Sequence, residues 1–143
     1  MPSAVSNVAK FRKWRTSVAQ SNAGTRIKLI RTGVQANVLV LASEYFGMPR
    51  AQFAKIMGMS PATAERKIKS GSLLGPIESE RLERLAIIES QAEKVFGDAE
   101  KAKSWLTQKN LALGDTPLSM LDTETGASEV RKVLGAIAYG GVV

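Results

Sequence analysis

The stretch from Phe53 to Lys69 has the residue types and the spacing of a helix-turn-helix. Gly58 can adopt the positive φ angle of a tight turn between two helices, and Ser60 followed by Pro61 is typical of a helix N-terminus. The small side chain of Ala54 lets the two helices approach closely. In a helix-turn-helix, the second helix enters the major groove of DNA by its N-terminal residues. The stretch therefore indicates DNA binding, and the alternative is an ordinary helical hairpin with a solvated basic face.

The predicted exposed face of the second helix carries side chains that suit DNA. We expect Thr63 to hydrogen-bond a base edge or a phosphate, and Arg66 to bind a guanine through two donors. Lys67 and Lys69 can neutralise phosphates. The predicted DNA-binding residues are Ser60, Ala62, Thr63, Arg66, Lys67 and Lys69.

Charge is distributed unevenly along the chain. Residues 1–33 hold seven basic and no acidic side chains, residues 34–71 hold five and two, and residues 72–143 hold eight and eleven. The net charge of +7 is thus the sum of a basic half and an acidic half. A basic half that contains a helix-turn-helix suits a polyanion, and the acidic half suits a different partner.

The composition argues against an enzyme. The chain has no cysteine and no histidine, which excludes disulfides, nearly excludes the usual zinc sites and removes catalysis by either residue. No glycine loop matches a phosphate cradle, and the carboxylates at positions 78, 80 and 83 fit a solvated helix face better than an acid–base pair. We predict no catalytic residue, no metal and no cofactor.

The sequence also gives no sign of a membrane segment. No apolar run reaches the roughly 18–20 residues of a membrane span, and the beginning of the sequence lacks the apolar region of a signal peptide. We expect a cytoplasmic protein.

Apolar periodicity predicts an all-α fold. Residues 1–32 are predicted to form a basic N-terminal arm, either as a short amphipathic helix or as a mobile segment, and residues 27–30 a short strand or extended lead-in. The helix-turn-helix domain is predicted over residues 33–76, with its first helix over 34–46. A helical domain is predicted over residues 77–143, and its first helix, residues 78–96, connects the two domains. The further helices expected there begin after Asp98, run from Thr116 through Leu121, and span residues 127–138.

The last predicted helix has one apolar and one basic face. Its apolar face consists of Val130, Val133, Leu134 and Ile137, and its polar face carries Arg131 and Lys132. Two glycines end the helix, and we expect the following Val142 and Val143 to be an exposed apolar terminus with a carboxylate. Such a pair is normal on a protein surface and carries little weight alone.

An ordered set of residues runs through the second half of the chain. It comprises Ala92-Glu-Lys-Val-Phe-Gly-Asp98, Ala102, Trp105, Leu106, Asn110, Leu113, Gly114, Thr116, Pro117, Leu118, Leu121, Thr123, Gly126, Val130, Leu134, Tyr139 and Gly140. This set resembles the toxin-binding domain of the Xre/MbcA/ParS antitoxins. The upstream helix-turn-helix, with Gly33, Thr63, Arg66 and residues 78–82, is similar to the Xre-like domain of the same proteins. The chain departs from the family pattern at Ala64, Lys67 and Lys109.

The resemblance implies an antitoxin of a bacterial toxin–antitoxin module. Its partner would be a RES-domain toxin that depletes NAD, bound by the last helix and terminus near the NAD site of the toxin. The N-terminal domain would repress the antitoxin's own operon. The toxin-binding residues implied by the resemblance are Arg131, Tyr139, Gly140, Gly141, Val142 and Val143.

We also expect a homodimer, because the apolar stripe from Leu82 to Phe96 exceeds what local packing needs and two recognition helices would suit a two-fold operator. One alternative function is a stand-alone helix-turn-helix regulator whose C-terminal domain only oligomerises. Another is a nucleoid-type protein that binds DNA through its basic arm without sequence preference.

Overall fold

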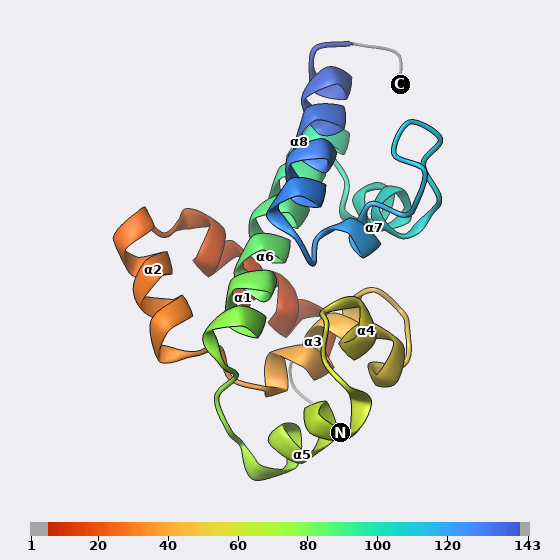
Figure 1. The fold of residues 1–143 in the computed structure, drawn as a ribbon. Helices are drawn as coiled ribbons and strands as arrows, with labels where there is room; N and C mark the ends of the chain where they lie inside the picture. The colour runs from red at the N-terminus through yellow and green to blue at the C-terminus, as the bar shows by residue number, and fades with distance from the viewer. Residues whose placement is uncertain (1–5, 141–143) are drawn as a thin grey trace.

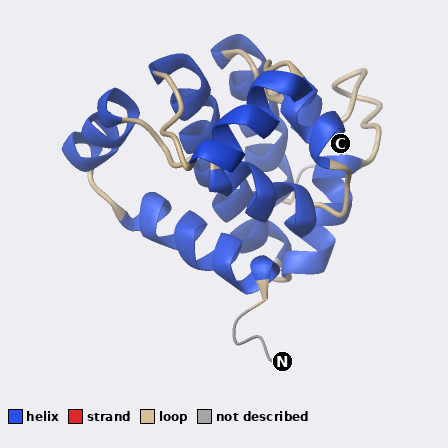
Figure 2. Ribbon diagram, turned by 90° about the horizontal axis from the view of Figure 1, so that it is seen from below, coloured by secondary structure: helices blue, strands red, loops and turns tan. Residues whose placement is uncertain are grey.

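The computed structural model describes residues 6–140, and within this range it contains helices and no β-strand (Figures 1 and 2). The prediction of an all-α fold is confirmed. In chain order the elements are α1 (Asn7–Gln20), α2 (Ala23–Thr32), α3 (Asn37–Tyr45), α4 (Arg50–Ile56), α5 (Pro61–Ser70), α6 (Pro76–Phe96), α7 (Ala99–Thr107), the 3₁₀ turn η1 (Leu118–Met120) and α8 (Glu124–Ala138).

Local sequence signals place the ends of most of these helices. Five helices begin at a residue whose side chain accepts a hydrogen bond from a backbone N–H of the first turn, namely Ser6, Asn22, Ser60, Asp98 and Thr123. Gly71 and Gly97 end α5 and α6 in the left-handed conformation that glycine adopts without strain. The prediction that a helix begins after Asp98 is confirmed.

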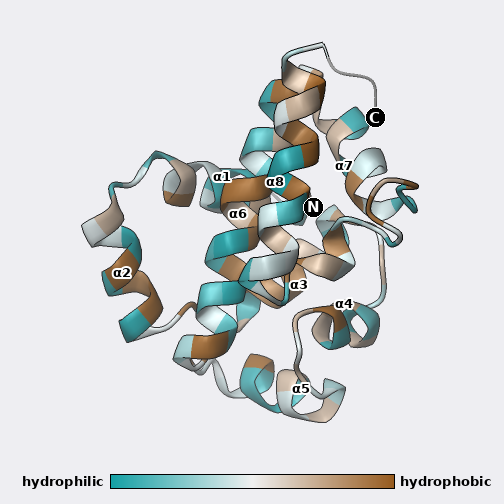
Figure 3. Cartoon of the chain, turned by 45° about the horizontal axis from the view of Figure 1, so that its top comes forward, coloured by the Kyte–Doolittle hydropathy of each residue, from teal (hydrophilic) through white to brown (hydrophobic). Residues whose placement is uncertain are grey.

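Helix α6 is the centre of the fold. Helices α1, α2, α7 and α8 all pack on it, and its side chains Leu82, Leu85 and Ile88 are fully buried. Figure 3 shows hydrophobic and hydrophilic residues side by side along α6 and α8, as expected for helices with one buried face. With 21 residues, α6 is about 30 Å long. It therefore extends from the helix-turn-helix at one end of the molecule to α8 at the other (Figure 1).

Of the two alternatives for the N-terminal arm, the structure shows the amphipathic helix and not a mobile segment, and this helix packs on the rest of the fold. Phe11 of α1 is fully buried, and its ring lies 4.7 Å from that of Tyr45 and 6.0 Å from that of Phe46. Helix α1 contacts both α3 and α6. Phe11 and Val18 lie on one face of the helix, so this face completes the core that α3 and α6 leave open.

A buried ion pair fixes α1 to α6. Nε of Arg15 lies 2.9 Å from Oε1 of Glu89, although the two atoms are poorly aligned for a hydrogen bond. The hydroxyl of Tyr45, on α3, donates to the other carboxylate oxygen of Glu89 at 2.5 Å, and Glu93 also contacts Arg15. Burial raises the pKa of Glu89, while Tyr45 and Arg15 act in the opposite direction. Three helices thus meet at one carboxylate.

The predicted strand or extended lead-in at residues 27–30 is also wrong, because these residues lie within α2. The side chain of Asn22 caps this helix, and Gly33 ends it with φ = 112°. Helix α2 packs on α6, where Arg26 forms an ion pair with Glu83 at 3.2 Å. A short β-prone run therefore became helix because it has a cap, a stop and a helix to pack on.

Helix α3 begins three residues later than predicted, because residues 34–36 pair with the segment after α5. The amide of Leu74 donates to the carbonyl of Val34 at 2.8 Å, and the amide of Val34 donates to the hydroxyl of Ser79 at 2.9 Å. A Cβ atom on Gly33 would lie 2.5 Å from the carbonyl oxygen of Leu74, so this close approach requires glycine. The pairing closes the helix-turn-helix domain.

Candidate functional site

The turn between α4 and α5 has the predicted geometry. Gly58 has φ = 77°, Ala54 is buried where the two helices meet, and Pro61 occupies the first turn of α5. The hydroxyl of Ser60 accepts a hydrogen bond from the amide of Thr63 at 3.1 Å. The helix-turn-helix prediction for this stretch is confirmed at the level of local structure.

Helix α5 presents most of the predicted DNA-binding residues outward. Ala62, Arg66 and Lys69 are exposed, whereas Thr63 and Lys67 are half-buried. Ser60 is exposed, but its hydroxyl caps the helix and donates to the hydroxyl of Thr63 at 2.8 Å. The inward face is formed by Ala64, which is buried, and by Ile68, which packs on the core.

The cations of α5 are available to a ligand. The acidic residue of this helix, Glu65, forms an exposed ion pair with Arg50 at 3.3 Å. Among residues 6–140, Arg66, Lys67 and Lys69 have no carboxylate within ion-pair distance. The exposed face of α5 therefore carries net positive charge at the edge of the molecule (Figure 1).

At the opposite end, α8 packs by one face and exposes its C-terminal end. Ala127, Val130 and Leu134 are fully buried, while Val133 and Ile137 are half-buried. Tyr139 follows the helix and is 94% exposed, and Gly140 is also exposed. Of the predicted toxin-binding residues, Gly141, Val142 and Val143 lie outside the described part of the chain.

Arg131, the remaining predicted toxin-binding residue, lies along the surface of α8 and is paired within the chain. Its guanidinium donates to the two carboxylate oxygens of Glu124, at 2.7 and 3.3 Å. The hydrogen bond from Arg131 is the largest of the effects that hold the pKa of Glu124 below its usual value. Arg131 lies in the middle of α8 and pairs with Glu124 at the start of the helix, whereas Tyr139 follows its end, so the structure does not bring the two together.

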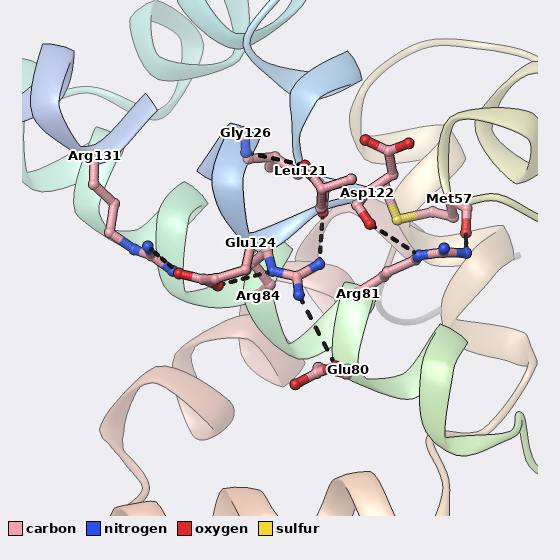
Figure 4. A network of polar contacts seen from close by, with 10 residues as sticks. Met57, Glu80, Arg81, Arg84, Leu121, Asp122, Glu124, Gly126 and Arg131 are labelled. Atoms are coloured by element: carbon pink, nitrogen blue, oxygen red, sulfur yellow. Dashed lines mark hydrogen bonds and ion pairs between the residues drawn. The ribbon is translucent and has the colours of Figure 1, made fainter. Parts of the chain in front are cut away.

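Two arginines of α6 bind backbone carbonyls and a carboxylate of neighbouring segments (Figure 4). Arg84 donates to the carbonyl of Leu121 at 2.9 Å and to the carboxylate of Glu124 at 3.3 Å, just before and at the start of α8. Arg81, one turn earlier, donates to the carbonyl of Met57 in the helix-turn-helix turn and to that of Asp122. Arg81 therefore bridges the DNA-binding turn and the turn before α8.

No pattern in the sequence predicted this network. Glu80, four residues before Arg84 on the same helix, lies 4.0 Å from its guanidinium, and Arg84 binds Leu121 and Glu124 more closely. The available signal was the position of Arg84, which adjoins Leu85 on the apolar stripe of α6 and is itself buried. A buried arginine needs partners, and here backbone carbonyls supply them.

The described residues offer surfaces for binding and no metal site. No group of three or more carboxylates in residues 6–140 is arranged to hold a metal ion. No helix in this range is long and apolar enough to cross a membrane. The fold and the two surfaces define a helical protein with a helix-turn-helix at one end and a second helical domain at the other.

Comparison with known proteins identifies both parts. Residues 25–86 match the antitoxin Xre-like helix-turn-helix domain, and residues 91–140 match the antitoxin Xre/MbcA/ParS C-terminal toxin-binding domain. "Antitoxin Xre" of Yersinia enterocolitica is 29% identical over 130 residues, which cover 89% of this chain and 88% of that protein. "Antitoxin Xre" of Photorhabdus laumondii is 28% identical over the same shares of both chains. "Antitoxin Xre" of Pseudomonas putida is 43% identical over 79 residues, which are 54% of this chain and 50% of that protein.

The chain belongs to the Xre/MbcA/ParS antitoxin family, and its helix-turn-helix domain precedes its toxin-binding domain. Members of this family are binding proteins and not enzymes. The toxin-binding domain implies a cognate toxin as partner, and the helix-turn-helix implies binding to DNA.

Proposed function

We propose that this antitoxin neutralises a RES-domain toxin by covering its NAD site with the end of α8, and that it represses its own operon through α5. The observation that carries the proposal is the separation of two exposed surfaces, one basic and one partly apolar, at opposite ends of α6 (Figure 1). Both surfaces can then be occupied at once. The protein would act in the bacterial cytoplasm, where operator DNA and NAD are found.

The toxin contact is proposed at the C-terminal end of α8. Tyr139 offers a large aromatic surface that is 94% exposed, and aromatic side chains are frequent anchors of protein interfaces. Gly140 and Gly141 have no side chains that would prevent entry of this segment into a concave nucleotide pocket, and Val142 and Val143 can fill such a pocket. Steric block of a substrate site requires no catalytic group on the antitoxin.

The DNA contact is proposed at the exposed face of α5. Arg66 lies one turn into the helix, where a guanidinium can reach the two acceptors of a guanine. Lys69 lies in the last turn and suits a phosphate. We propose that two copies of the chain bind a two-fold operator, since the two half-sites of such an operator each take one recognition helix.

Deletion of Gly140 to Val143 tests the toxin part of this proposal. Gly140, the described residue of this segment, follows α8 and is exposed, and we expect the deletion to leave the fold and DNA binding unchanged. Toxin inhibition should be lost or strongly weakened when the variant is co-expressed with the cognate toxin and cellular NAD is measured. A truncated protein that still prevents NAD loss would place the inhibitory contact elsewhere.

The alternative of a stand-alone regulator makes a different prediction for the same experiment. In that case the full-length chain would not co-purify with any RES-domain protein encoded beside it, and its expression would not rescue growth. A competition binding assay with promoter and random DNA separates both functions from unspecific binding, for which the two DNAs would compete equally.

A further inference from the structure

The most exposed large apolar side chain among the described residues is neither on α5 nor on α8. Leu111 is 96% exposed, at the tip of the loop that connects α7 to η1. Single exposed apolar residues are common on proteins, so exposure alone assigns nothing. The surroundings of Leu111 distinguish it.

The loop that carries Leu111 is closed by its own hydrogen bonds. The amide of Asn110 donates to the carbonyl of Asp115 at 3.0 Å, and the amide of Gly114 donates to the carbonyl of Asn110 at 2.8 Å. The side chain of Asn110 accepts from the amide of Leu113 at 3.1 Å. Gly114 supplies the positive φ of 81° that the turn requires. Hydrogen bonds therefore hold the backbone around Leu111, while the Leu111 side chain itself is exposed.

Two leucines of this loop have opposite environments. Leu113 is half-buried and packs on the core, which attaches the loop to the domain. Leu111, two residues earlier, has almost no intramolecular contact. A fixed loop that holds an apolar side chain in solvent loses little conformational entropy when that side chain enters a partner.

The position of the loop indicates which partner this is. Leu111 lies within residues 91–140, which match the toxin-binding domain. The loop stands at the same end of the molecule as the end of α8, and α5 lies at the other end (Figure 1). Tyr139, the other large apolar side chain with more than nine-tenths of its surface exposed, is at that end too.

We propose that Leu111 is a second anchor for the toxin and inserts into an apolar recess on the toxin surface, beside the contact made by the end of α8. This inference depends on the proposed toxin partner and adds to it a contact outside the active site. Two separate anchors orient the antitoxin on the toxin, whereas the end of α8 alone would leave it free to rotate. The loop anchor would contribute to the choice of toxin without blocking NAD.

The test is Leu111→Asp in the full-length chain, with Ile77→Asp as the matched control. Ile77 is 62% exposed at the start of α6 and lies outside the toxin-binding match, so both variants place a carboxylate on an exposed apolar position. Binding to the purified cognate RES toxin is measured by titration calorimetry. We expect Leu111→Asp to weaken the complex about tenfold or more and Ile77→Asp to change it by less than about twofold. Melting temperatures and promoter affinity should match those of the wild type.

Leu111→Ala provides a second variant that introduces no charge, and it should weaken toxin binding in the same direction by a smaller factor. If both Leu111 variants bind the toxin with wild-type affinity, Leu111 is not an anchor, and the proposed function is unaffected. A wild-type chain that does not bind the toxin would overturn the proposed function and the anchor with it. If Leu111→Asp instead abolishes self-association of the free antitoxin and retains toxin binding, the surface is a contact between copies of this chain and the proposal is wrong.

Discussion

The two ends of the molecule use their basic residues in opposite ways. On α5, Arg66 and Lys69 are exposed and have no carboxylate partner among the described residues. On α8, Arg131 is bound by both oxygens of Glu124, and the exposed group beyond the helix is the ring of Tyr139. Unpaired cations suit a polyanion, whereas an end with paired cations and an exposed aromatic ring suits a protein. Both surfaces contain basic residues, and what distinguishes them is whether those residues are paired with a carboxylate of the same chain.

Both ends nevertheless depend on one scaffold. Helix α6 contacts the helix-turn-helix turn through Arg81 and the start of α8 through Arg84. Its buried Glu89 connects it to α1 and α3. Substitutions in α6 should therefore affect both surfaces. Substitutions in the turn between α4 and α5, or near the start of α8, should affect only the surface next to them.

The largest expected effect is that of Glu89→Ala, which should destabilise the whole fold and thereby weaken the DNA-binding and toxin-binding surfaces together. It leaves the buried Arg15 and the hydroxyl of Tyr45 without their shared partner, at a cost of about 3–5 kcal/mol in the free energy of unfolding. Urea denaturation measures this loss. Arg12→Ala is the control, because Arg12 is exposed and its ion pair with Glu93 should contribute less than about 1 kcal/mol. Equal losses in the two variants would contradict a central role for the buried carboxylate.

Two glycine substitutions should each weaken the function of one end of the molecule and not that of the other. A Cβ atom on Gly126 would lie 2.1 Å from the carbonyl oxygen of Met120, so Gly126→Ala should shift α8 and weaken toxin binding. A Cβ atom on Gly58 would lie 2.0 Å from a guanidinium nitrogen of Arg81 in a turn with φ = 77°, so Gly58→Ala should weaken DNA binding. Each should cost about 1–3 kcal/mol of stability. If both variants lose both activities to the same degree at a temperature where each is folded, the two surfaces are not independent.

On α5, two single substitutions should differ in kind. Arg66→Ala should weaken operator binding by about 1–3 kcal/mol and reduce the preference for operator over random DNA. Lys69→Ala should weaken binding to operator and random DNA alike, because a phosphate contact carries no sequence information. It should also lower the salt dependence of DNA binding. Gel-shift titrations at matched salt measure both effects, and toxin binding should be unchanged. Unaltered operator affinity after Arg66→Ala would reject the proposed orientation of α5.

The smallest expected effect concerns the ion pair on α8 and its dependence on pH. Because Arg131 lowers the pKa of Glu124 in the folded state, the pair stabilises the fold above the usual pKa of a glutamate and loses this contribution as the pH falls through the lowered value. Glu124 is well exposed, so solvent screening limits the contribution to at most about 1 kcal/mol. The difference in unfolding free energy between wild type and Glu124→Gln should therefore be small at pH 7 and vanish in acid. A difference that grows in acid would have the wrong sign for this pair.

Comparing wild type with Glu124→Gln at the same pH also cancels the effect of Glu89 on stability, whose pH dependence has the opposite sign. Its raised pKa means that the folded protein holds this proton more tightly than the unfolded chain does. Stability therefore falls as the pH rises from the usual pKa towards the raised one. Both proteins in the Glu124 comparison contain Glu89, so this effect cancels.

The sequence alone determined the features that depend on neighbouring residues. Gly58, Ser60 and Pro61 define the turn and the start of α5, because a positive φ, a cap and a proline at the first position act within a few residues. The long amphipathic pattern after residue 77 predicted α6, although the predicted first residue is two residues later than the observed one. The resemblance to the antitoxin family also rests on such an ordered pattern, and the comparisons confirm it.

Only the tertiary structure decided how distant segments meet. The pattern of Phe11 and Val18 was compatible with a free arm, and the pairing of Arg15 with Glu89 is what makes α1 part of the core. Likewise, residues 27–30 have a β-prone composition, and the surface of α6 selects helix for them. Whether Leu111 is buried or exposed follows from the way its loop closes on the domain, and no local preference specifies this. Long-range contacts of this kind depend on the whole packed arrangement, and a single sequence does not reveal which distant side chains become neighbours.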